Sequence, residues 1–234
     1  MRKSIVLILL LFISLGTKAQ FSINYSVGYG DYKMSDLKAL TQLAFDLGKE
    51  SEQLPQGLRL VDNFPAYVTH TMDALYRIKM HEFGVKASYL TTGSKMAYSD
   101  YSGSYIEKIV ANGYRVGLMY RVHFYTLPIN NKNYKVSFLA ELSPALLFSS
   151  LKTEGEIKIY DVNNEQSKEN FSEDKIKKTA YSIQPLAGTQ LALYKHFLFT
   201  MTAGYDFSLG AKLNPLHRID WSGFRFNLGV GYAF

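Results

Sequence analysis

The chain of 234 residues contains no cysteine. This absence excludes disulfides, thiolate metal sites, a cysteine nucleophile and a lipid-modified N-terminal cysteine. Long apolar runs are also missing, because no later stretch reaches the roughly 18 apolar residues that a membrane-spanning helix needs. An exported protein of a bacterial envelope can do without disulfides where its fold needs no covalent support.

A strong excess of one charge is missing as well. The formal net charge is +6, but Arg2, Lys3 and Lys18 lie in the N-terminal segment. Without those three, the 26 basic residues fall to 23, against 20 acidic residues. This near balance is not the signature of a nucleic-acid-binding protein, so no nucleic-acid partner is predicted.

The N-terminus has the pattern of an export signal. Arg2 and Lys3 give a basic start, residues 5–15 form an almost unbroken apolar run, and small residues follow, ending at Ala19. The run is too short for a stable membrane span. We therefore predict a signal peptide over residues 1–19, cleaved after Ala19; an uncleaved N-terminal anchor is the alternative.

Residues 20–234, predicted to form one domain, alternate between apolar and small or polar residues. In the last segment the even positions from Phe224 to Phe234 are all large and apolar, and the odd ones are Arg, Asn, Gly or Ala. Successive side chains of a strand point to opposite faces, so such a segment predicts a strand with one apolar face. Eight segments follow this rule: 21–30, 64–77, 83–89, 114–122, 134–143, 181–193, 197–207 and 224–234.

The links between these segments alternate in length. Long links lie at 31–63, 92–111 and 150–178, and short ones at 78–82, 126–132 and near Lys195. Strands of about ten residues with long loops on one side and short turns on the other are typical of outer-membrane barrels. We predict an all-β fold, an eight-stranded antiparallel transmembrane up-and-down β-barrel. Aromatic residues, 15% of the chain, cluster near the segment ends, as in the girdles of such barrels.

A soluble, lipocalin-like barrel is the alternative fold, with its apolar faces turned inward around a ligand. The faces of the strands opposite the apolar ones distinguish the two folds. They carry Gly, Ser, Thr, Asn and Gln more often than the Lys and Glu of a solvent-facing surface. Small polar side chains suit a narrow lumen, which favours the membrane barrel.

With its export signal, its eight alternating segments and the terminal aromatic Phe234, the chain resembles the small Gram-negative outer-membrane β-barrel family, the OmpA- and OmpX-like barrels. The resemblance rests on pattern and implies fold and location. In that family a C-terminal strand ending in Phe resembles the signal read by the barrel-assembly machinery. It therefore implies that Tyr232 and Phe234 form an assembly signal, and that the partners are outer-membrane lipid and this machinery. The family's separate peptidoglycan-binding domain is expected to be absent.

An eight-stranded barrel is just wide enough for its own side chains to fill it. By strand parity, the charged residues of the lumen are the acids Asp73, Glu141 and Asp206 and the bases Arg77, Lys86, Arg115, Arg121 and Arg225. Hairpin registers place Glu141 opposite Met119 and diagonal to Arg121, and Asp206 roughly opposite Arg225. Because buried charges must be paired, we predict a charge network that plugs the lumen. The alternative is a narrow, slightly anion-selective pathway, since five bases exceed three acids.

No catalytic residue, metal site or cofactor is predicted. The histidines are scattered over the predicted fold, at His70, His81, His123, His196 and His217. None lies beside a serine and a carboxylate in an arrangement for nucleophilic catalysis, and they do not converge as metal ligands. A lipid-modifying enzyme stays an alternative only with a site assembled from distant strands.

The long links are predicted to carry any binding function. In the first link, Ser35 suits a helix N-cap and Gly48 a C-cap, which predicts a short amphipathic helix. Its apolar stripe is predicted to consist of Leu37, Leu40, Ala44 and Leu47. In the hydrophilic stretch 152–178 of the third link, Ile157, Ile159 and Val162 indicate that the strands continue as a protruding hairpin with an edge open to pairing.

The second link, 91–104, is rich in Ser, Tyr and Gly, a composition typical of adaptable contact surfaces. We therefore predict a non-enzymatic outer-membrane barrel with a structural or surface-interaction role, whose outer loops bind an extracellular protein or glycan. The alternatives are a narrow porin-like channel for small solutes, a lipid-modifying enzyme and the soluble binder.

Overall fold

The computed structural model of the protein describes residues 20–50, 57–129, 134–160, 166–173, 175–194, 196–213 and 217–234. The predicted signal peptide lies outside these residues. In chain order the elements are β1 (Gln20–Gly30), α2 (Ser35–Glu50), β2 (Arg59–Asn63), β3 (Tyr67–Ile78), β4 (His81–Ser99), β5 (Gly103–Ile129), β6 (Tyr134–Tyr160), β7 (Gln166–Ser172), β8 (Ile176–Leu193), β9 (Phe197–Gly210) and β10 (Gly223–Ala233).

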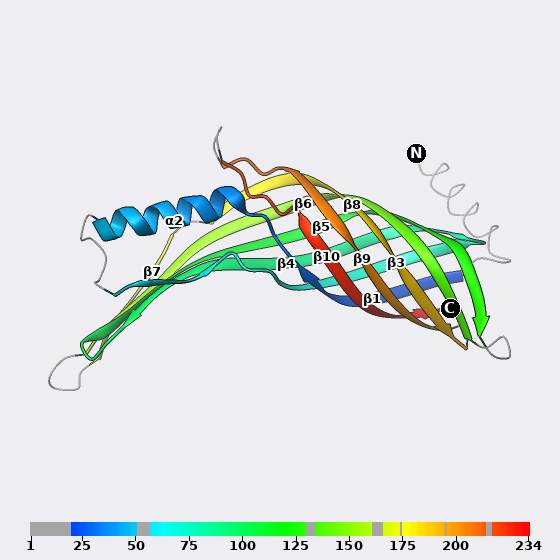
Figure 1. Ribbon diagram of the computed structural model, residues 1–234, viewed down its shortest axis with the longest axis horizontal. Helices are drawn as coiled ribbons and strands as arrows, with labels where there is room; N and C mark the ends of the chain where they lie inside the picture. The colour runs from blue at the N-terminus through cyan, green and yellow to red at the C-terminus, as the bar shows by residue number, and fades with distance from the viewer. Residues whose placement is uncertain are drawn as a thin grey trace, which may run out of the picture.

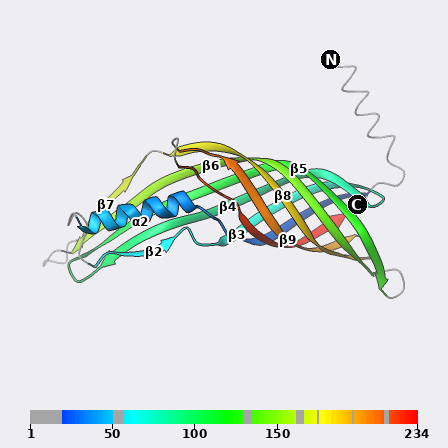
Figure 2. The ribbon, with the colours of Figure 1, turned by 45° about the horizontal axis from the view of Figure 1, so that its top comes forward.

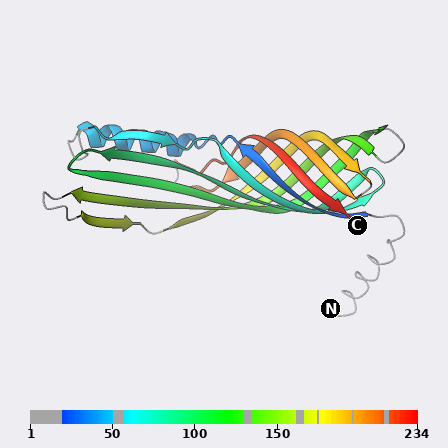
Figure 3. The same cartoon turned by 90° about the horizontal axis from the view of Figure 1, so that it is seen from below.

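By their pairing, eight of these strands close into a ring. Figures 1 and 3 show the resulting barrel. Around the ring the order is β1, β3, β4, β5, β6, β8, β9 and β10, and each neighbouring pair is antiparallel. β10 returns to pair with β1 from Ser22↔Ala233 to Gly30↔Arg225, which closes the ring. Apart from β2 and β7, each strand pairs with its neighbours in sequence. The predicted eight-stranded up-and-down barrel is confirmed.

The exterior of the barrel is apolar and the interior is polar. On β1 the side chains of Phe21, Ile23 and Tyr25 are 41–43% exposed, whereas Ser22 and Asn24 between them are 4–5% exposed. The same alternation runs along the other barrel strands, so a continuous apolar band surrounds the outside. A soluble ligand-binding barrel would have the opposite arrangement, with its apolar side inward.

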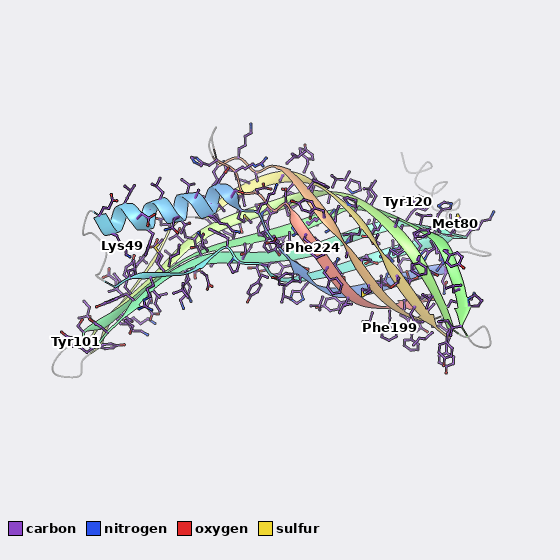
Figure 4. All side chains as sticks on the ribbon, in the orientation of Figure 1. Lys49, Met80, Tyr101, Tyr120, Phe199 and Phe224 are labelled. Carbon is purple, nitrogen blue, oxygen red and sulfur yellow. The ribbon has the colours of Figure 1, made fainter. Side chains whose placement is uncertain are left out.

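Aromatic rings gather at both margins of this band. We call the end of the barrel where β1 starts and β10 stops the turn end, and the opposite end the loop end. Exposed rings at the turn end include Phe21, Phe83, Phe197 and Phe234, and those at the loop end include Tyr29, Tyr114, Phe148, Tyr181 and Phe224. Figure 4 shows Tyr120 near the turn end and Phe224 nearer the loop end. This is the girdle arrangement of barrels that span a bilayer.

Beyond the loop end, three barrel strands continue as an outer sheet (Figure 2). We use this name for residues 91–99 of β4, 103–112 of β5 and 150–160 of β6, together with β2 and β7. β4 and β5 stay paired up to Ser99↔Ser104, and β5 and β6 up to Gly103↔Ile159. The protruding hairpin predicted in the third link is confirmed by the pairing of β6 with β7.

The prediction of a long loop over 92–111 is wrong, because nearly all of it belongs to the β4–β5 hairpin. The period-two signal is weak there for a physical reason. Along β5 the outer-sheet residues of both parities are mostly half-buried, so apolar residues such as Ile106 and Ile109 occur on either parity. Residues 100–102 alone form the turn.

Helix α2 packs along the outer sheet and confirms the predicted helix in the first long link. Its Phe45 contacts Leu58 and Met96 in a small apolar cluster. The predicted stripe is wrong in detail: the buried residues are Leu37, Thr41 and Phe45, while Leu47 is 54% exposed. The bulky ring of Phe45 fills the space above the sheet and sets the rotation of the helix. No helix in the described part of the chain is long and apolar enough to cross a membrane.

The registers predicted for two hairpins need correction. Glu141 lies directly opposite Arg121, not opposite Met119, because the β5–β6 ladder continues to Ile129↔Tyr134 and contains a bulge between His123 and Tyr125. The bulge adds one residue to β5 and turns both Phe124 and Tyr125 outward, 61% and 55% exposed. Across the last link, Asp206 pairs with Gly223 and Arg225 with Gly204, two positions from the predicted pairing.

Candidate functional site: the lumen and the outer sheet

The part of the lumen toward the turn end holds a charge cluster centred on Glu141. Its carboxylate accepts hydrogen bonds from Lys86 Nζ at 2.6 Å and from Arg121 Nη2 at 2.9 Å. These three side chains are 1–5% exposed. Lys86 also donates to Gln184 Oε1 at 2.9 Å. Mutual pairing offsets the large desolvation penalty that each isolated charge would carry here.

Glu82, which the sequence analysis missed, completes this cluster. Its carboxylate lies 3.2 Å from Arg121 Nη1 and 2.9 Å from His123 Nε2. Arg77, at the rim with 27% of its side chain exposed, approaches the same carboxylate at 3.6 Å. A signal was present in the sequence, because Glu82 has the same parity as the inward-facing Lys86. The predicted segment started one residue too late to include it.

Asp73 lies beside this cluster without an ion pair of its own. Its Oδ1 accepts a hydrogen bond from Asn24 Nδ2 at 2.5 Å. Lys86 is directly opposite Asp73 in the β3–β4 register but extends to Glu141 instead. Among the described residues, no basic group forms an ion pair with Asp73.

A second cluster lies toward the loop end, around Asp206. Arg115 Nε is 3.6 Å and Arg225 Nη2 is 3.8 Å from Asp206 Oδ2, and Ser182 donates to Oδ1 at 2.6 Å. Arg115 also donates to the hydroxyl and to the carbonyl of Ser143. The β5–β6 ladder is interrupted beside Ser143. Arg115 therefore pairs with the Asp206 carboxylate and also donates to the Ser143 carbonyl, which has no partner in the β5–β6 ladder.

Above this cluster an apolar plug closes the loop end of the lumen, a feature that the sequence analysis did not predict. It consists of Tyr32, Met34, Leu37, Phe64, Leu90, Ala111, Leu147, Ala180, Ala211, Ile219 and Trp221. Trp221, fully buried, donates from Nε1 to Ser149 Oγ at 2.8 Å and meets the ring of Tyr32 edge-on at 5.1 Å. Gly113 leaves room for this indole, because a Cβ there would lie 3.1 Å from Trp221 Cζ2.

Arg225 joins the plug to the charged layer beneath it. Its guanidinium stacks on Tyr32 at 4.7 Å from the ring centroid, and it donates to the carbonyls of Asp31 and Trp221 at 2.7 and 2.5 Å. The backbone N–H of Lys33 donates to the carbonyl of Ser222 at 2.8 Å, which connects the two segments of the plug. The plug is thus held by the same arginine that faces Asp206.

Acids and bases balance in the buried lumen. The acids are Asp73, Glu82, Glu141 and Asp206, and the bases are Lys86, Arg115, Arg121 and Arg225. The excess of bases that suggested an anion pathway disappears once Glu82 is included and Arg77 is placed at the rim. A void among the lower charges, next to Asn24 and Thr202, measures about 20 Å³. A space of this size fits roughly one water molecule and no hydrated ion.

The histidine side chains do not form one group, although the backbones of His81 and His123 are neighbours in the β4–β5 ladder. His123 is inside the lumen against Glu82, His70 faces outward with Nδ1 2.8 Å from the hydroxyl of Tyr25, and His81 and His196 lie at the turn end. His81 Nδ1 is 2.8 Å from Tyr120 OH, and His196 Nδ1 is 2.9 Å from the carbonyl of Ala233. In the part of the chain that the structure describes, no three His, Asp or Glu side chains converge as metal ligands.

The two residues of the implied assembly signal lie in the turn-end girdle. Tyr232 and Phe234 are 5.1 Å apart between ring centroids, and Phe234 also faces Phe21 at 5.9 Å. The backbone N–H of Phe234 donates to the carbonyl of Phe21 at 2.8 Å. Both rings therefore point outward beside the seam where β10 meets β1.

The far tip of the outer sheet presents an exposed aromatic ring on a built turn (Figure 4). Tyr101 is 94% exposed. The turn beneath it is held by Asp100, whose carboxylate accepts from Tyr98 OH at 2.5 Å, from Ser102 N at 2.8 Å and from Gly103 N at 3.0 Å. The bond from Tyr98, followed by those from Ser102, lowers the pKa of Asp100 from 3.8 to about 2.

Comparison with known proteins adds a loose likeness to membrane barrels. No family model and no curated protein matches the chain. Ail, the attachment invasion locus protein of Yersinia pestis in complex with the heparin analogue sucrose octasulfate, is 13% identical, with 92% of this chain and 97% of that chain covered and a TM-score of 0.34. The N-terminal β-barrel domain of Pseudomonas aeruginosa OprF is 14% identical, with 93% and 100% covered and a TM-score of 0.32. Neisserial surface protein A is 11% identical, with 92% and 97% covered and a TM-score of 0.34. Likeness at this level carries no argument, and the barrel is established by the strand pairing of the chain itself.

Proposed function

We propose that the protein is a non-enzymatic outer-membrane β-barrel with a sealed lumen, exported by a signal peptide over residues 1–19. In this proposal the barrel anchors the outer sheet, which contacts an extracellular protein or glycan. Tyr232 and Phe234 act as the signal read by the barrel-assembly machinery, and lipid covers the apolar band. The observation that carries the proposal is the combination of an apolar exterior with a lumen filled by buried charges, most of them paired, and by an apolar plug.

The filled lumen argues against a porin-like channel. A solute would have to pass both the plug around Trp221 and the ion pairs of Glu141, and each layer is nine-tenths or more buried. Opening such a layer exposes unpaired charges or breaks packed apolar contacts, each at a cost of several kcal/mol. Barrels of eight strands have just enough interior for their own side chains.

The surface-interaction role is supported by the shape of the outer sheet. Its strands continue about ten residues beyond the loop-end aromatic rings, from Tyr89 to Ser99 on β4, and end in the exposed ring of Tyr101. Rigid aromatic anchors lose little conformational entropy on binding and are enriched at contact sites. The hydrogen bonds of Asp100 order the backbone turn that carries this ring.

Two measurements test the proposal. The full chain is expressed in a Gram-negative host; we expect it in urea-washed outer membranes, with different gel mobility before and after boiling. The purified protein is then placed in planar bilayers, where we expect no conductance steps. Recovery as a soluble periplasmic protein would contradict the location, and steady single-channel currents would favour the porin-like alternative. An altered lipid profile on expression that His123→Ala or His70→Ala abolishes would instead favour the lipid-modifying enzyme.

A further inference from the structure

The outward face of the outer sheet is a direct continuation of the lipid-facing surface of the barrel. On β5 the ring of Tyr114, 54% exposed, belongs to the loop-end girdle. The next side chains of the same parity are Asn112, Val110 and Lys108. Since alternate residues of a strand share a face, this series leads from the apolar band onto the outer sheet without changing sides.

Four lysines occupy this face on four adjacent strands, and we call them the lysine patch: Lys95, Lys108, Lys152 and Lys177. Lys108 comes six residues beyond Tyr114 of the girdle, and Lys95 six residues beyond Tyr89, which pairs with Tyr114. Lys152 and Lys177 come four residues beyond Phe148 and Tyr181. At about 3.3 Å per residue along strands that tilt by about 40°, Lys152 and Lys177 rise about 10 Å above the girdle, and Lys95 and Lys108 about 15 Å. The first two therefore lie at the headgroup layer and the other two just above it, where long lysine side chains can reach back toward it.

The patch holds more positive charge than the sheet neutralises. Lys95 and Lys108 lie directly opposite each other, an arrangement of like charges that is unfavourable in a sheet. The flanking acids are Asp62, opposite Lys95, and Glu154, opposite Lys108. Glu154 is also bound by Lys152 at 2.7 Å, so two carboxylates face four ammonium groups.

The other acid nearby does not supply the missing charge. Glu156 already accepts from Lys158 at 2.7 Å and from Lys168 at 2.8 Å. Within the described residues, Lys95, Lys108 and Lys177 form no ion pair. The patch is therefore left with a net charge of about +2, which an external anion can satisfy.

The sheet surface is hollowed at this place. One groove of about 280 Å³ is lined by Tyr67, Thr91 and Lys95 and reaches Lys108. A second groove of about 280 Å³ runs from Lys108 to Lys152 and on toward β7. Lys108 thus stands where the two grooves meet, and carboxylates line them as well: Asp62 in the first groove, Glu154 and Glu156 in the second.

We propose that the lysine patch binds the anionic, phosphate-bearing headgroups of lipids in the leaflet that surrounds the loop end of the barrel. The occupant is a lipid because the face continues the lipid-contacting surface, and because basic groups close to a bilayer are attracted to anionic headgroups. The inference rests on the membrane location proposed above. It names the headgroup chemistry that this side of the barrel selects.

The test uses the full folded protein in detergent with equal amounts of phosphatidylglycerol and phosphatidylcholine of the same acyl chains, and native mass spectrometry counts the lipids retained. We expect the wild type to retain phosphatidylglycerol preferentially. K95Q/K108Q should lose about fivefold of this preference for each lysine removed, from about 1 kcal/mol per basic residue. The matched control K49Q/K212Q removes the same charge from α2 and from the last link, away from Lys95 and Lys108, and should keep the preference.

Three results would overturn the proposal. If the wild type retains equal numbers of phosphatidylglycerol and phosphatidylcholine molecules, the proposal is refuted. If both double variants lose the preference for phosphatidylglycerol equally, the preference comes from the net charge of the protein and not from the lysine patch. Displacement of the lipid by millimolar inorganic phosphate would make the patch a site for a soluble anion. Heat-modified mobility on gels checks separately that each variant is a folded barrel, so failure of the barrel itself is distinguishable.

Discussion

Replacing Glu141 by alanine tests the ion-paired lumen most sharply. The carboxylate is the shared partner of Lys86 at 2.6 Å and Arg121 at 2.9 Å, and its side chain is 1% exposed. Removing one member of a buried ion pair costs about 3–5 kcal/mol, because the remaining charge stays buried without compensation. Arg121 keeps Glu82 at 3.2 Å, so the loss falls mainly on Lys86. Lys86 keeps its bond to Gln184 and lies opposite Asp73, which puts the expected cost toward the lower end of this range. We therefore expect E141A to lower the free energy of unfolding by about 3–5 kcal/mol.

The assay is urea unfolding in lipid vesicles, followed by the fluorescence of Trp221, the one tryptophan of the chain. The matched control is E154A, which breaks the pair with Lys152 on the outer sheet, where the side chains are 49% and 41% exposed. Exposed pairs contribute less than about 1 kcal/mol. E141L/K86M should recover most of the loss, since apolar side chains can replace a buried pair. If E141A and E154A cost the same, the lumen charges are solvated and the sealed-lumen account is wrong.

The remaining predictions concern the plug, the outer hairpin and the tip. Trp221→Ala should cost about 3–5 kcal/mol of unfolding free energy by leaving a cavity, yet show no conductance in planar bilayers because the ion pairs below it persist; steady currents would contradict this. Gly155→Val should speed amide hydrogen exchange in β7 at least tenfold while the barrel amides stay unchanged, because a Cβ at Gly155 would lie 1.8 Å from the ring of Phe171; unchanged exchange in β7 would refute the contact. The depressed pKa of Asp100, about 2 against an ordinary 3.8, means that the ionised carboxylate stabilises the tip above about pH 4, and that this stabilisation disappears as the pH falls toward 2. Tyr98→Phe should move this pKa back toward 3.8, as carboxyl NMR would record; an unmoved pKa would count against the hydrogen bond.

The barrel could be predicted from the sequence because its strands have two different environments. Lipid outside and a narrow lumen inside impose strict alternation, as in Phe21 to Gly30, and each strand repeats it. The outer part of β5 has no such contrast, since its residues of both parities are mostly half-buried. For that reason the strand extension through Ile106 and Ile109 looked like a loop.

The candidate site was predictable as a set of inward charges but not as a set of pairs. Parity placed Glu141 and Arg121 on the same face, whereas their direct pairing depends on a bulge at residue 124 that no local pattern announces. The plug was not predictable for another reason. Tyr32, Phe64 and Trp221 come from links far apart in the sequence and meet only once the barrel has closed.

The central claim is that the apolar side of the barrel faces lipid and the polar side faces a sealed lumen. The most direct measurement is quenching of tryptophan fluorescence by brominated lipids in vesicles. Native Trp221, buried in the plug, should be little quenched, whereas W221F/L228W, with its indole at an outward position that is 54% exposed, should be strongly quenched. Strong quenching of Trp221 and none at position 228 would contradict the account, because the apolar side would then face inward.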